Sequence, residues 1–360
     1  MKKVLVVSGI PYSETNRGVD TITTYFIENN YDVEHLVFGV NRKKKIEELK
    51  KREIILKNFK QLYNLPTKLP YRILNKFPFL LKLYSLEKNF STRKIEFEKY
   101  DLIFLETGYP LFLINKIPVT TKVILRMSDP IDFSFGINHK KFELLERMAI
   151  ERSTLTLIAH KKLCNFYEQY KNIEYWRTGF DEKRIKSNKT LSKVEEELFY
   201  MGNTQVDFEL LENIIRLNPK ISINIVGNHQ YNSKNSQLKI HGYLDSREYI
   251  ESLQKSKCYI MPFNSKEVEK MKMLGMTSKF YVAMQLGKPI LVRRYGEIQK
   301  DNLDLNIFTY DNLEEANEKL NFILKNNFSK NPKINIFLEE LKNENRKKEL
   351  ETILKKYNLV

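Results

Sequence analysis

Short apolar segments alternate with amphipathic helical segments along this chain, and this alternation constrains its fold more than any other feature. In the first half, strands are expected at Lys3–Ser8, Val33–Phe38, Leu102–Glu106, Lys122–Met127 and Leu155–Ala159, and helices at Thr21–Asn29, Phe142–Glu151 and Lys161–Tyr170. Short, continuous apolar runs are typical of parallel strands that are buried on both faces. Alternation of strand and helix therefore predicts a doubly wound parallel sheet.

The alternation stops at a charged linker and then begins again. The linker is expected over 175–187, where a turn around Gly179 leads into a charged stretch without apolar periodicity. Beyond it, strands are expected at Leu198–Gly202, Ile221–Val226, Lys239–Gly242, Cys258–Pro262 and Pro289–Val292, and helices at Phe208–Arg216, Ser246–Ser256, Thr277–Leu286, Leu313–Leu324 and Ile336–Tyr357. The sequence thus predicts an α/β chain with two Rossmann-like domains, 1–180 and 190–335, facing a cleft.

Length and composition agree with two globular domains and narrow the class of protein. The chain has 360 residues, of which 42% are hydrophobic and 29% charged. Its two cysteines, Cys164 and Cys258, lie far apart, and its five histidines are scattered, so neither a disulfide framework nor a metal site is expected. The apolar run after Met1 is too short for a signal peptide, and no stretch of about 18 apolar residues is present. We therefore expect a cytoplasmic protein.

The positive charge is concentrated in an insertion at 41–100 within the first domain. This segment has 17 Lys or Arg and 6 Asp or Glu, a net charge of +11 out of +16 for the whole chain. Its second part adds large apolar residues such as Phe77, Phe79 and Leu83. Basic and large apolar residues together suit the surface of an anionic membrane. The alternative is a lysine-rich helical insertion whose apolar side packs into the core.

The segment from Pro262 to Pro289 carries the clearest indication of a ligand. The chain has neither GxGxxG after a strand nor GxxxxGK[ST], which argues against NAD-dependent oxidoreductases and P-loop NTPases. Instead, Gly275 precedes a helix that Thr277 or Ser278 can cap, with Lys279 in its first turn. A lysine beside the positive end of a helix favours an anionic ligand such as a diphosphate.

The same segment resembles the SKxxExxAxGxP signature of GT-B glycosyltransferases, through Ser278-Lys279, Ala283 and Gly287-Lys288-Pro289. Three upstream segments, 199–203, 224–227 and 242–244, are similar to other parts of that family's nucleotide domain. The resemblance implies donor-binding roles for Met201, Gly202, Asn203, Gly227, Asn228, Tyr243, Phe263, Met276, Thr277, Ser278 and Lys279. It also implies that a C-terminal helix at 336–360 packs back on the first domain.

Two departures from the GT-B pattern concern the mechanism. Leu274 and Val282 stand where retaining members carry the two glutamates of an E-x7-E pair. The sequence is closer to the inverting, membrane-associated glucuronosyltransferase family of xanthan and exopolysaccharide synthesis, whose lysine, pocket aromatic and loop methionine match Lys279, Phe263 and Met201. That family's glutamine falls on Val282, so contacts to the donor ribose are expected to differ.

The acceptor side is expected in the first domain. Asp129 follows the strand 122–127 and resembles the general base of the xanthan family, with Asp132 as the competing candidate. Asp129 is otherwise a simple turn residue, because Asp-Pro is common in turns. Arg126 is expected to pair with whichever of these two carboxylates is buried, or to face a neighbouring helix. The loop 8–18, with Gly9, Tyr12 and Arg17, either lines an acceptor pocket or is a long surface turn.

The sequence therefore predicts a metal-independent, inverting glycosyltransferase without a cofactor. We expect it to transfer a sugar from a nucleoside-diphosphate sugar, with UDP as the nucleotide, to a lipid-linked or polysaccharide acceptor. Capsule, exopolysaccharide or lipopolysaccharide synthesis in a bacterium is the expected pathway, at the inner face of the cell membrane. The alternatives are a sugar-nucleotide epimerase of the same fold and a non-enzymatic basic protein that binds membranes or nucleic acid, although no nucleic-acid partner is expected.

Overall fold

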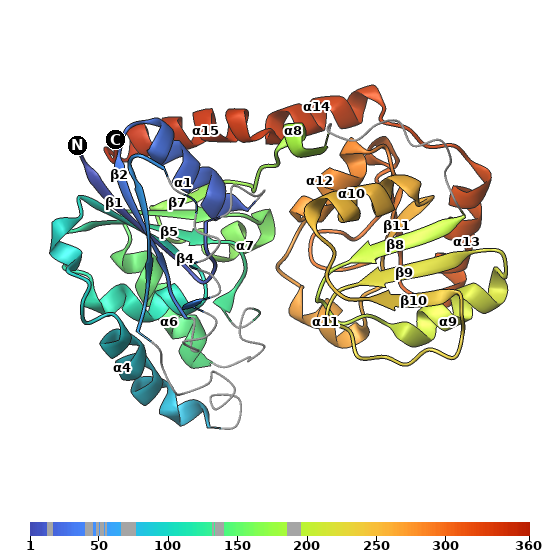
Figure 1. Ribbon diagram of the computed structural model, residues 1–360, viewed down its shortest axis with the longest axis horizontal. Coiled ribbons are helices and arrows are strands. Elements are labelled where there is room, and N and C mark those ends of the chain that lie inside the picture. The colour runs from blue at the N-terminus through green and yellow to red at the C-terminus, as the bar shows by residue number, and fades with distance from the viewer. Residues whose placement is uncertain are drawn as a thin grey trace. The chain divides into compact units, whose positions relative to one another are not determined.

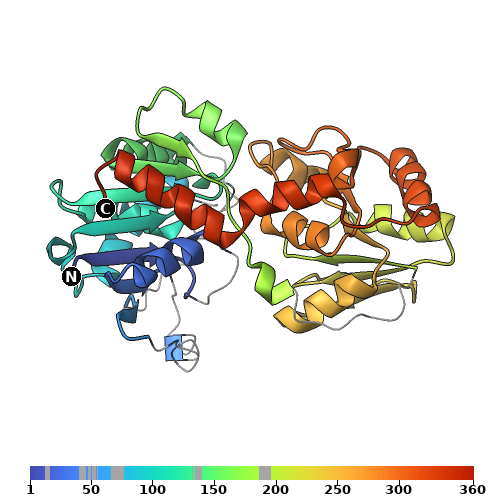
Figure 2. The same ribbon diagram turned by 90° about the horizontal axis from the view of Figure 1, so that it is seen from above.

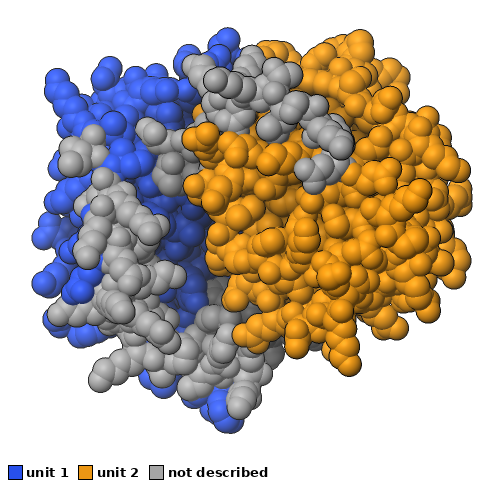
Figure 3. Space-filling view, turned by 45° about the vertical axis from the view of Figure 1, so that its right-hand side comes forward, with its two compact units in different colours: residues 1–179, 343–360 blue, residues 180–342 orange. Residues whose placement is uncertain are grey.

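The computed structural model describes residues 1–12, 17–39, 46–47, 50, 54, 56–65, 77–131, 133, 140–185 and 196–360. The chain divides into two compact units, coloured separately in Figure 3. Unit 1 comprises Met1–Gly179 together with Asn343–Val360, and unit 2 comprises Phe180–Lys342. Both units are α/β, each built on a parallel sheet with helices, as the sequence predicts (Figure 1).

Unit 1 contains a seven-stranded sheet in the order β3-β2-β1-β4-β5-β6-β7. Its strands are β1 (Lys3–Ser8), β2 (Asp32–Val37), β3 (Phe59–Tyr63), β4 (Leu102–Glu106), β5 (Lys122–Met127), β6 (Leu155–Ile158) and β7 (Ile173–Tyr175), all paired in parallel. The two edge strands, β3 and β7, were not among the expected strands. Neither is a continuous apolar run: β3 has one buried residue and β7 has none.

The helices of unit 1 are α1 (Gly18–Glu28), α4 (Leu81–Ser91), α6 (Lys140–Arg152), α7 (Lys161–Phe166) and α15 (Asn343–Lys356), with the 3-10 helices η1 (Pro78–Leu80), η2 (Phe97–Lys99) and η3 (Tyr109–Lys116). The C-terminal helix α15 lies beside α1 (Figure 2). Its residues Leu350 and Leu354 are buried in one hydrophobic cluster with Val4 of β1. The indole nitrogen of Trp176 donates a hydrogen bond to the backbone oxygen of Arg346 at 3.2 Å.

The expected helix over Ile336–Tyr357 is divided. The first part belongs to α14 (Pro332–Leu341) in unit 2, and the second part is α15 in unit 1. Lys342 separates them with an extended backbone, at φ −57° and ψ 139°. The amphipathic pattern is continuous through this point, so periodicity alone does not reveal where the chain passes from one core to the other.

The segment 41–100 is partly an integral part of unit 1. Strand β3 pairs with β2, and Tyr84 and Lys88 of α4 are fully buried. Other members of the segment are exposed, including Phe79 at 68% and Leu86 at 58%. In the described parts of the chain, no helix combines the length and the apolarity needed to cross a bilayer.

Unit 2 contains a six-stranded parallel sheet in the order β10-β9-β8-β11-β12-β13. Its strands are β8 (Glu197–Met201), β9 (Ser222–Val226), β10 (Leu238–His241), β11 (Cys258–Met261), β12 (Ile290–Arg293) and β13 (Ile307–Tyr310). Its helices are α8 (Glu182–Ile185), α9 (Phe208–Leu217), α10 (Ser246–Lys255), α11 (Ser265–Lys270), α12 (Ser278–Gln285), α13 (Leu313–Lys325) and α14, with η4 (Leu303–Leu305). The strand order reverses between β8 and β11, and ligands of such sheets bind beyond the carboxyl ends of the strands at this point.

Candidate functional site

Two glycines shape the carboxyl ends of β8 and β9 in unit 2. Gly202 donates its backbone N–H to Val226 at 2.9 Å, and its carbonyl oxygen contacts Nε2 of His229 at 2.6 Å. Gly227 has φ +142°, in the region that favours glycine. A Cβ atom on Gly227 would overlap the Gly202 carbonyl, and one on Gly202 would overlap Nζ of Lys279. The two turns therefore pack together closely beside this lysine.

Lys279 lies in the first turn of α12, with its ammonium nitrogen 5.5 Å from the centre of the Tyr200 ring. Burial lowers the pKa of Lys279 to about 8. Within the described parts of the chain, its ammonium group forms neither an ion pair nor a hydrogen bond. A desolvated cation without a counter-charge, at the positive end of a helix, is a strong site for an anion.

The helix start offers further unpaired donors. Thr277 is the N-cap residue, but its side chain does not cap the helix, and its buried Oγ1 has no partner among the described residues. The N–H of Phe280 donates to the Thr277 carbonyl at 3.0 Å. The N–H groups of Ser278 and Lys279 have no partner in the described chain. Such groups point along the helix axis toward a ligand at the N-terminus.

Asn203 connects three loops at the same end of the sheet. Its Oδ1 accepts hydrogen bonds from the N–H of Asn228 at 3.2 Å and from the hydroxyl of Tyr243 at 3.0 Å. The Tyr243 side chain is 67% exposed, so its ring presents an open face. The structure thus brings the expected residues of the β8, β9 and β10 loops into one hydrogen-bonded group.

Three other expected donor residues, Phe263, Met201 and Met276, pack or hydrogen bond within unit 2. Phe263 is almost fully buried, with its ring centre 6.1 Å from that of Tyr200 and 5.7 Å from that of Tyr295, so it packs within the unit. The backbone oxygen of Met201 accepts a hydrogen bond from Tyr259 at 3.2 Å. The backbone oxygen of Met276, just before the N-cap, accepts a longer one from Tyr281 at 3.4 Å.

In unit 1, Asp129 follows the carboxyl end of β5 and is partly buried. Burial raises the pKa of its carboxyl group, against the opposing influence of Arg126 and a hydrogen bond from Ser128. The Oδ1 atom lies 4.0 Å from Nε2 of His160, which follows β6. Burial and the positive charge of Arg126 lower the pKa of His160 to about 4, so the imidazole is neutral at pH 7.

Arg126 is held by several partners within unit 1. Its guanidinium forms an ion pair with Glu106 at the end of β4 and donates to the hydroxyl of Thr178 at 2.7 Å. A Cβ atom on Gly18 would overlap this guanidinium, so Gly18 leaves the space that Arg126 occupies. Arg126 therefore pairs with Glu106, which is not one of the two aspartates that the sequence put forward as its partner.

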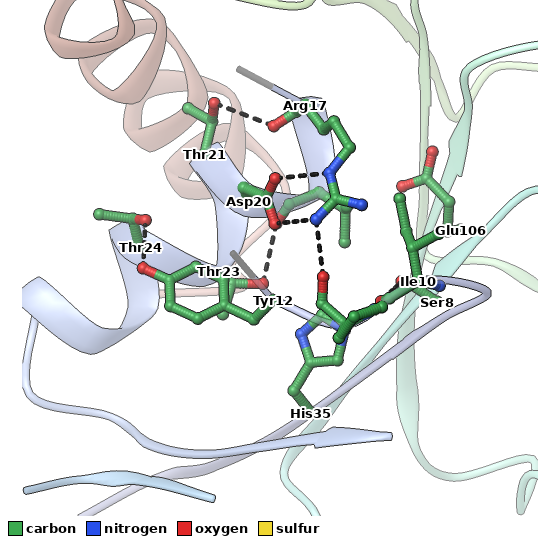
Figure 4. A network of polar contacts seen from close by, with 12 residues as sticks. Ser8, Ile10, Tyr12, Arg17, Asp20, Thr21, Thr23, Thr24, His35 and Glu106 are labelled. Atoms are coloured by element: carbon green, nitrogen blue, oxygen red, sulfur yellow. Dashed lines mark hydrogen bonds and ion pairs between the residues drawn. The ribbon is translucent and has the colours of Figure 1, made fainter. Parts of the chain in front are cut away.

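The loop after β1 is braced by polar contacts (Figure 4). Tyr12 is buried, with its hydroxyl 2.9 Å from the Thr24 hydroxyl, and Arg17 binds Asp20 at 2.7 Å and the Pro11 carbonyl at 2.6 Å. Gly9 is exposed. Tyr12 and Arg17 are thus engaged with the protein itself, so only a rearrangement would free them for a ligand.

Sequence analysis did not predict every residue of these sites. One residue that it did predict is not described by the structure. Asp132 is among the residues that the structure does not describe. Glu106, His160, Tyr200 and His229 were not singled out. A signal for Glu106 and His160 does exist, because each stands at or just after the end of an expected strand. The sequence carries no comparable signal for His229 and Tyr200, because their contacts with Gly202 and Lys279 arise only in the folded unit.

The chain is thus a two-unit, doubly wound α/β protein with a desolvated lysine at a helix start in one unit and a carboxylate–imidazole pair in the other. No protein-family model matches the chain, and no curated protein matches it in sequence.

The fold of the chain is similar to those of several solved structures. It aligns with sucrose-phosphate synthase from Thermosynechococcus elongatus at TM-score 0.67 and 10% identity, over 99% of both chains. α,α-Trehalose 6-phosphate synthase from Burkholderia multivorans gives TM-score 0.63 and 7% identity over 99% of this chain and 97% of that one. Spinosyn rhamnosyltransferase SpnG, complexed with thymidine diphosphate, gives 0.51 and 10% over 98% and 100%. The chain thus has the GT-B fold of these glycosyltransferases.

Proposed function

We propose that this protein is a glycosyltransferase that uses a nucleoside-diphosphate sugar, with UDP as the nucleotide. The observation that carries the proposal is the Lys279 ammonium group at the start of α12, which has no counter-charge in the described chain. The diphosphate of the donor supplies that counter-charge. The likeness to glycosyltransferase structures, one of them holding thymidine diphosphate, supports the same class of ligand.

In the proposed reaction, unit 2 binds the donor. Negative charge develops on the diphosphate as its bond to the anomeric carbon breaks, and Lys279 together with the N–H groups of α12 stabilises that charge. A cation and a helix end can do this without a metal ion. Tyr243 offers a stacking face for the nucleotide base, held in place by Asn203.

Unit 1 provides the general base. The Asp129 carboxylate removes the proton of an acceptor hydroxyl while its oxygen attacks the anomeric carbon, and the nucleoside diphosphate leaves from the opposite side. This single displacement inverts the anomeric configuration. A raised pKa makes Asp129 a stronger base than an ordinary aspartate. The identities of Leu274 and Val282 support the inverting course, because neither side chain offers a carboxylate where retaining members carry the E-x7-E pair.

The acceptor is proposed to be a lipid-linked saccharide at the inner face of the cell membrane, in the synthesis of a capsule, an exopolysaccharide or a lipopolysaccharide. The positive charge of 41–100 and the exposed apolar side chains of α4 support attachment to an anionic membrane. A relation to the inverting glucuronosyltransferases rests on the residues of the donor segment.

One observation favours a second candidate, a sugar-nucleotide epimerase. Glu106, Asp129 and His160 gather at one end of the unit 1 sheet, and such a group can remove and return a proton on a sugar. Incubation of the protein with a donor in deuterated water, without an acceptor, separates the two candidates. An epimerase incorporates deuterium into the sugar, whereas a transferase does not.

The direct test is a thermal-shift screen of UDP, GDP and CDP, followed by donor hydrolysis across a panel of nucleotide sugars. We expect one nucleotide to raise the unfolding temperature, since binding to the native state alone stabilises it. Absence of a response to every nucleotide would refute the donor site.

A further inference from the structure

An apolar groove lies on the surface of unit 1 between α4, α6 and η3. Its volume is about 590 Å³, and its lining includes Phe79, Leu86, Phe112, Leu144 and Met148. Both helices are seen at the lower part of unit 1 in Figure 1. A cavity of this size falls in the range of sites that hold small molecules, roughly 300–1,000 Å³.

The groove walls expose apolar side chains to an unusual degree. Phe79 is 68% exposed, Leu86 58% and Leu144 57%, and they come from separate parts of the chain. Phe90, one turn beyond Leu86 in α4, is 60% exposed. Contiguous exposed apolar surface of this kind marks a site that something else covers.

The opposite face of α4 anchors the groove in the unit. Tyr84 is fully buried, with its ring centre 5.2 Å from that of Phe112, and the ammonium of Lys88 lies 4.6 Å from the Tyr84 ring centre. Helix α4 is therefore firmly packed against the unit, and the exposure of Leu86 and Phe90 does not result from missing core contacts of the helix as a whole. One face of α4 is buried in unit 1, and the other face is exposed to solvent.

We propose that this groove binds a hydrocarbon chain of an anionic membrane lipid. Charge decides between a lipid and a protein as the occupant. The described residues 77–94 carry four Lys or Arg and one Glu, a net charge of +3, and Lys88 alone of the four basic residues is fully buried. Lys82 lines the groove, Arg93 and Lys94 are exposed just beyond α4, and no acidic side chain is among the lining residues. An apolar slot with basic residues around it matches an acyl or prenyl chain below a phosphate headgroup.

The inference deepens the membrane attachment in the proposed function by naming where hydrocarbon enters. It does not depend on the donor site in unit 2. Binding of a lipid chain and binding of a nucleotide are therefore separate measurements, and either can fail alone.

Fluorescence quenching tests the groove directly. The chain has one tryptophan, Trp176, which is fully buried in the core of unit 1. Phe79→Trp places a second tryptophan on the groove. With vesicles of phosphatidylglycerol brominated on its acyl chains, we expect the variant to be quenched and the parent protein to remain unquenched. Ile336→Trp, at a 66% exposed position of α14 in unit 2, is the matched control and should not be quenched.

A second pair of variants tests the same groove without a reporter. Leu86→Asp should weaken co-sedimentation with these vesicles by about tenfold, which corresponds to about 1.4 kcal/mol, because the variant loses the burial of one apolar side chain. Ile336→Asp should leave it unchanged. Salt-sensitive vesicle binding without quenching of Phe79→Trp would overturn the groove and leave a purely electrostatic contact. Absence of vesicle binding would overturn it too, and an unchanged thermal shift with UDP would show that the donor site stands.

Discussion

Nε2 of His160 lies 4.0 Å from Oδ1 of Asp129, at the carboxyl ends of two neighbouring strands in unit 1. The imidazole is almost fully buried, forms a hydrogen bond to the backbone of Ser128, and is neutral at pH 7 because its pKa is about 4. Because the His160 imidazole is neutral, it does not form an ion pair with the Asp129 carboxylate, whose negative charge is therefore not neutralised by this neighbour. This arrangement supports the proposed role of Asp129 as a general base, with His160 as a residue that positions it.

Asp129→Asn should lower kcat by about 10²- to 10⁴-fold, the range of general-base contributions. The amide keeps the shape of the side chain but accepts no proton. The measurement is transfer of sugar to acceptor, with UDP binding followed by thermal shift on the same sample. We expect UDP binding to stay intact, since the donor residues belong to unit 2. Full transfer activity in the variant would contradict Asp129 and turn attention to Asp132.

His160→Leu should move the acid limb of the kcat/KM profile to higher pH. An apolar neighbour solvates the Asp129 carboxylate less well than an imidazole, so the pKa of Asp129 rises further and activity is lost at a higher pH. His160→Asn, which keeps a polar group there, should show a smaller shift. Equal loss of activity at every pH in both variants would indicate a purely structural role.

Much of the fold was predictable, because a buried parallel strand leaves an apolar run of its own in the sequence. The central strands of both sheets were expected within a residue or two, and the α/β class is confirmed. The edge strands β3 and β7 were missed because an edge is only half covered, which removes the apolar signal. The edge strand β13 was missed as well, although all four of its residues are buried. The break at Lys342 arises because the two halves of the expected helix pack into different units, and hydrophobic periodicity carries no information about this.

For the sites, the sequence located the ends of strands and the start of α12, including Lys279 and Asp129. It could not locate groups that matter through their neighbours. The proximity of His160 to Asp129 and the ion pair between Arg126 and Glu106 arise from strand order, which joins residues 20 or more positions apart. The roles of these residues in catalysis stay predictions.

Acid should destabilise unit 1 through its buried histidines. Burial lowers the pKa of His35 to about 4, its Nε2 lies 3.1 Å from the Ile10 carbonyl, and its Nδ1 has no partner in the described chain. A folded pKa below the unfolded value of 6.5 gives stability that is present above pH 6.5 and is lost as the pH falls toward 4. At pH 5 the loss is about 2 kcal/mol for His35.

Urea unfolding at pH 7 and pH 5 measures this effect, and Trp176 reports on unit 1 because it is the single tryptophan and is buried there. His35→Gln, which keeps a donor for the Ile10 carbonyl, should reduce the difference between the two pH values by about 2 kcal/mol. The raised pKa values of Glu106 and Asp129 act in the opposite direction and are common to both proteins. His241→Gln, at an exposed position, should change nothing. An identical pH dependence in His35→Gln and the parent would refute the assignment.

Nucleotide binding should weaken as the pH rises through about 8, because the free protein then loses the proton of Lys279. Diphosphate oxygens favour the charged ammonium, so binding takes up a proton above this pH, and the affinity falls by up to about tenfold per pH unit. The phosphates of UDP are already ionised there, since their last pKa is about 6. Titration calorimetry with UDP from pH 7 to pH 9, in buffers of different ionisation enthalpy, measures both the affinity and the proton uptake. Lys279→Met should bind UDP more weakly at pH 7 and show no pH dependence.

Lys288 is the matched control for this experiment, because burial lowers its pKa to about 8 as well. Its ammonium, however, donates hydrogen bonds to the carbonyl oxygens of Gln254 at 2.7 Å and Ser256 at 2.6 Å inside the unit. Lys288→Met should therefore lower the stability of unit 2 by roughly 1–3 kcal/mol through those unpaired carbonyls, yet keep the pH dependence of UDP binding. If the dependence disappears in Lys288→Met and persists in Lys279→Met, the anion site has been assigned to the wrong lysine. The difference between these two lysines is a matter of partners, since the pKa of each is lowered to about the same value.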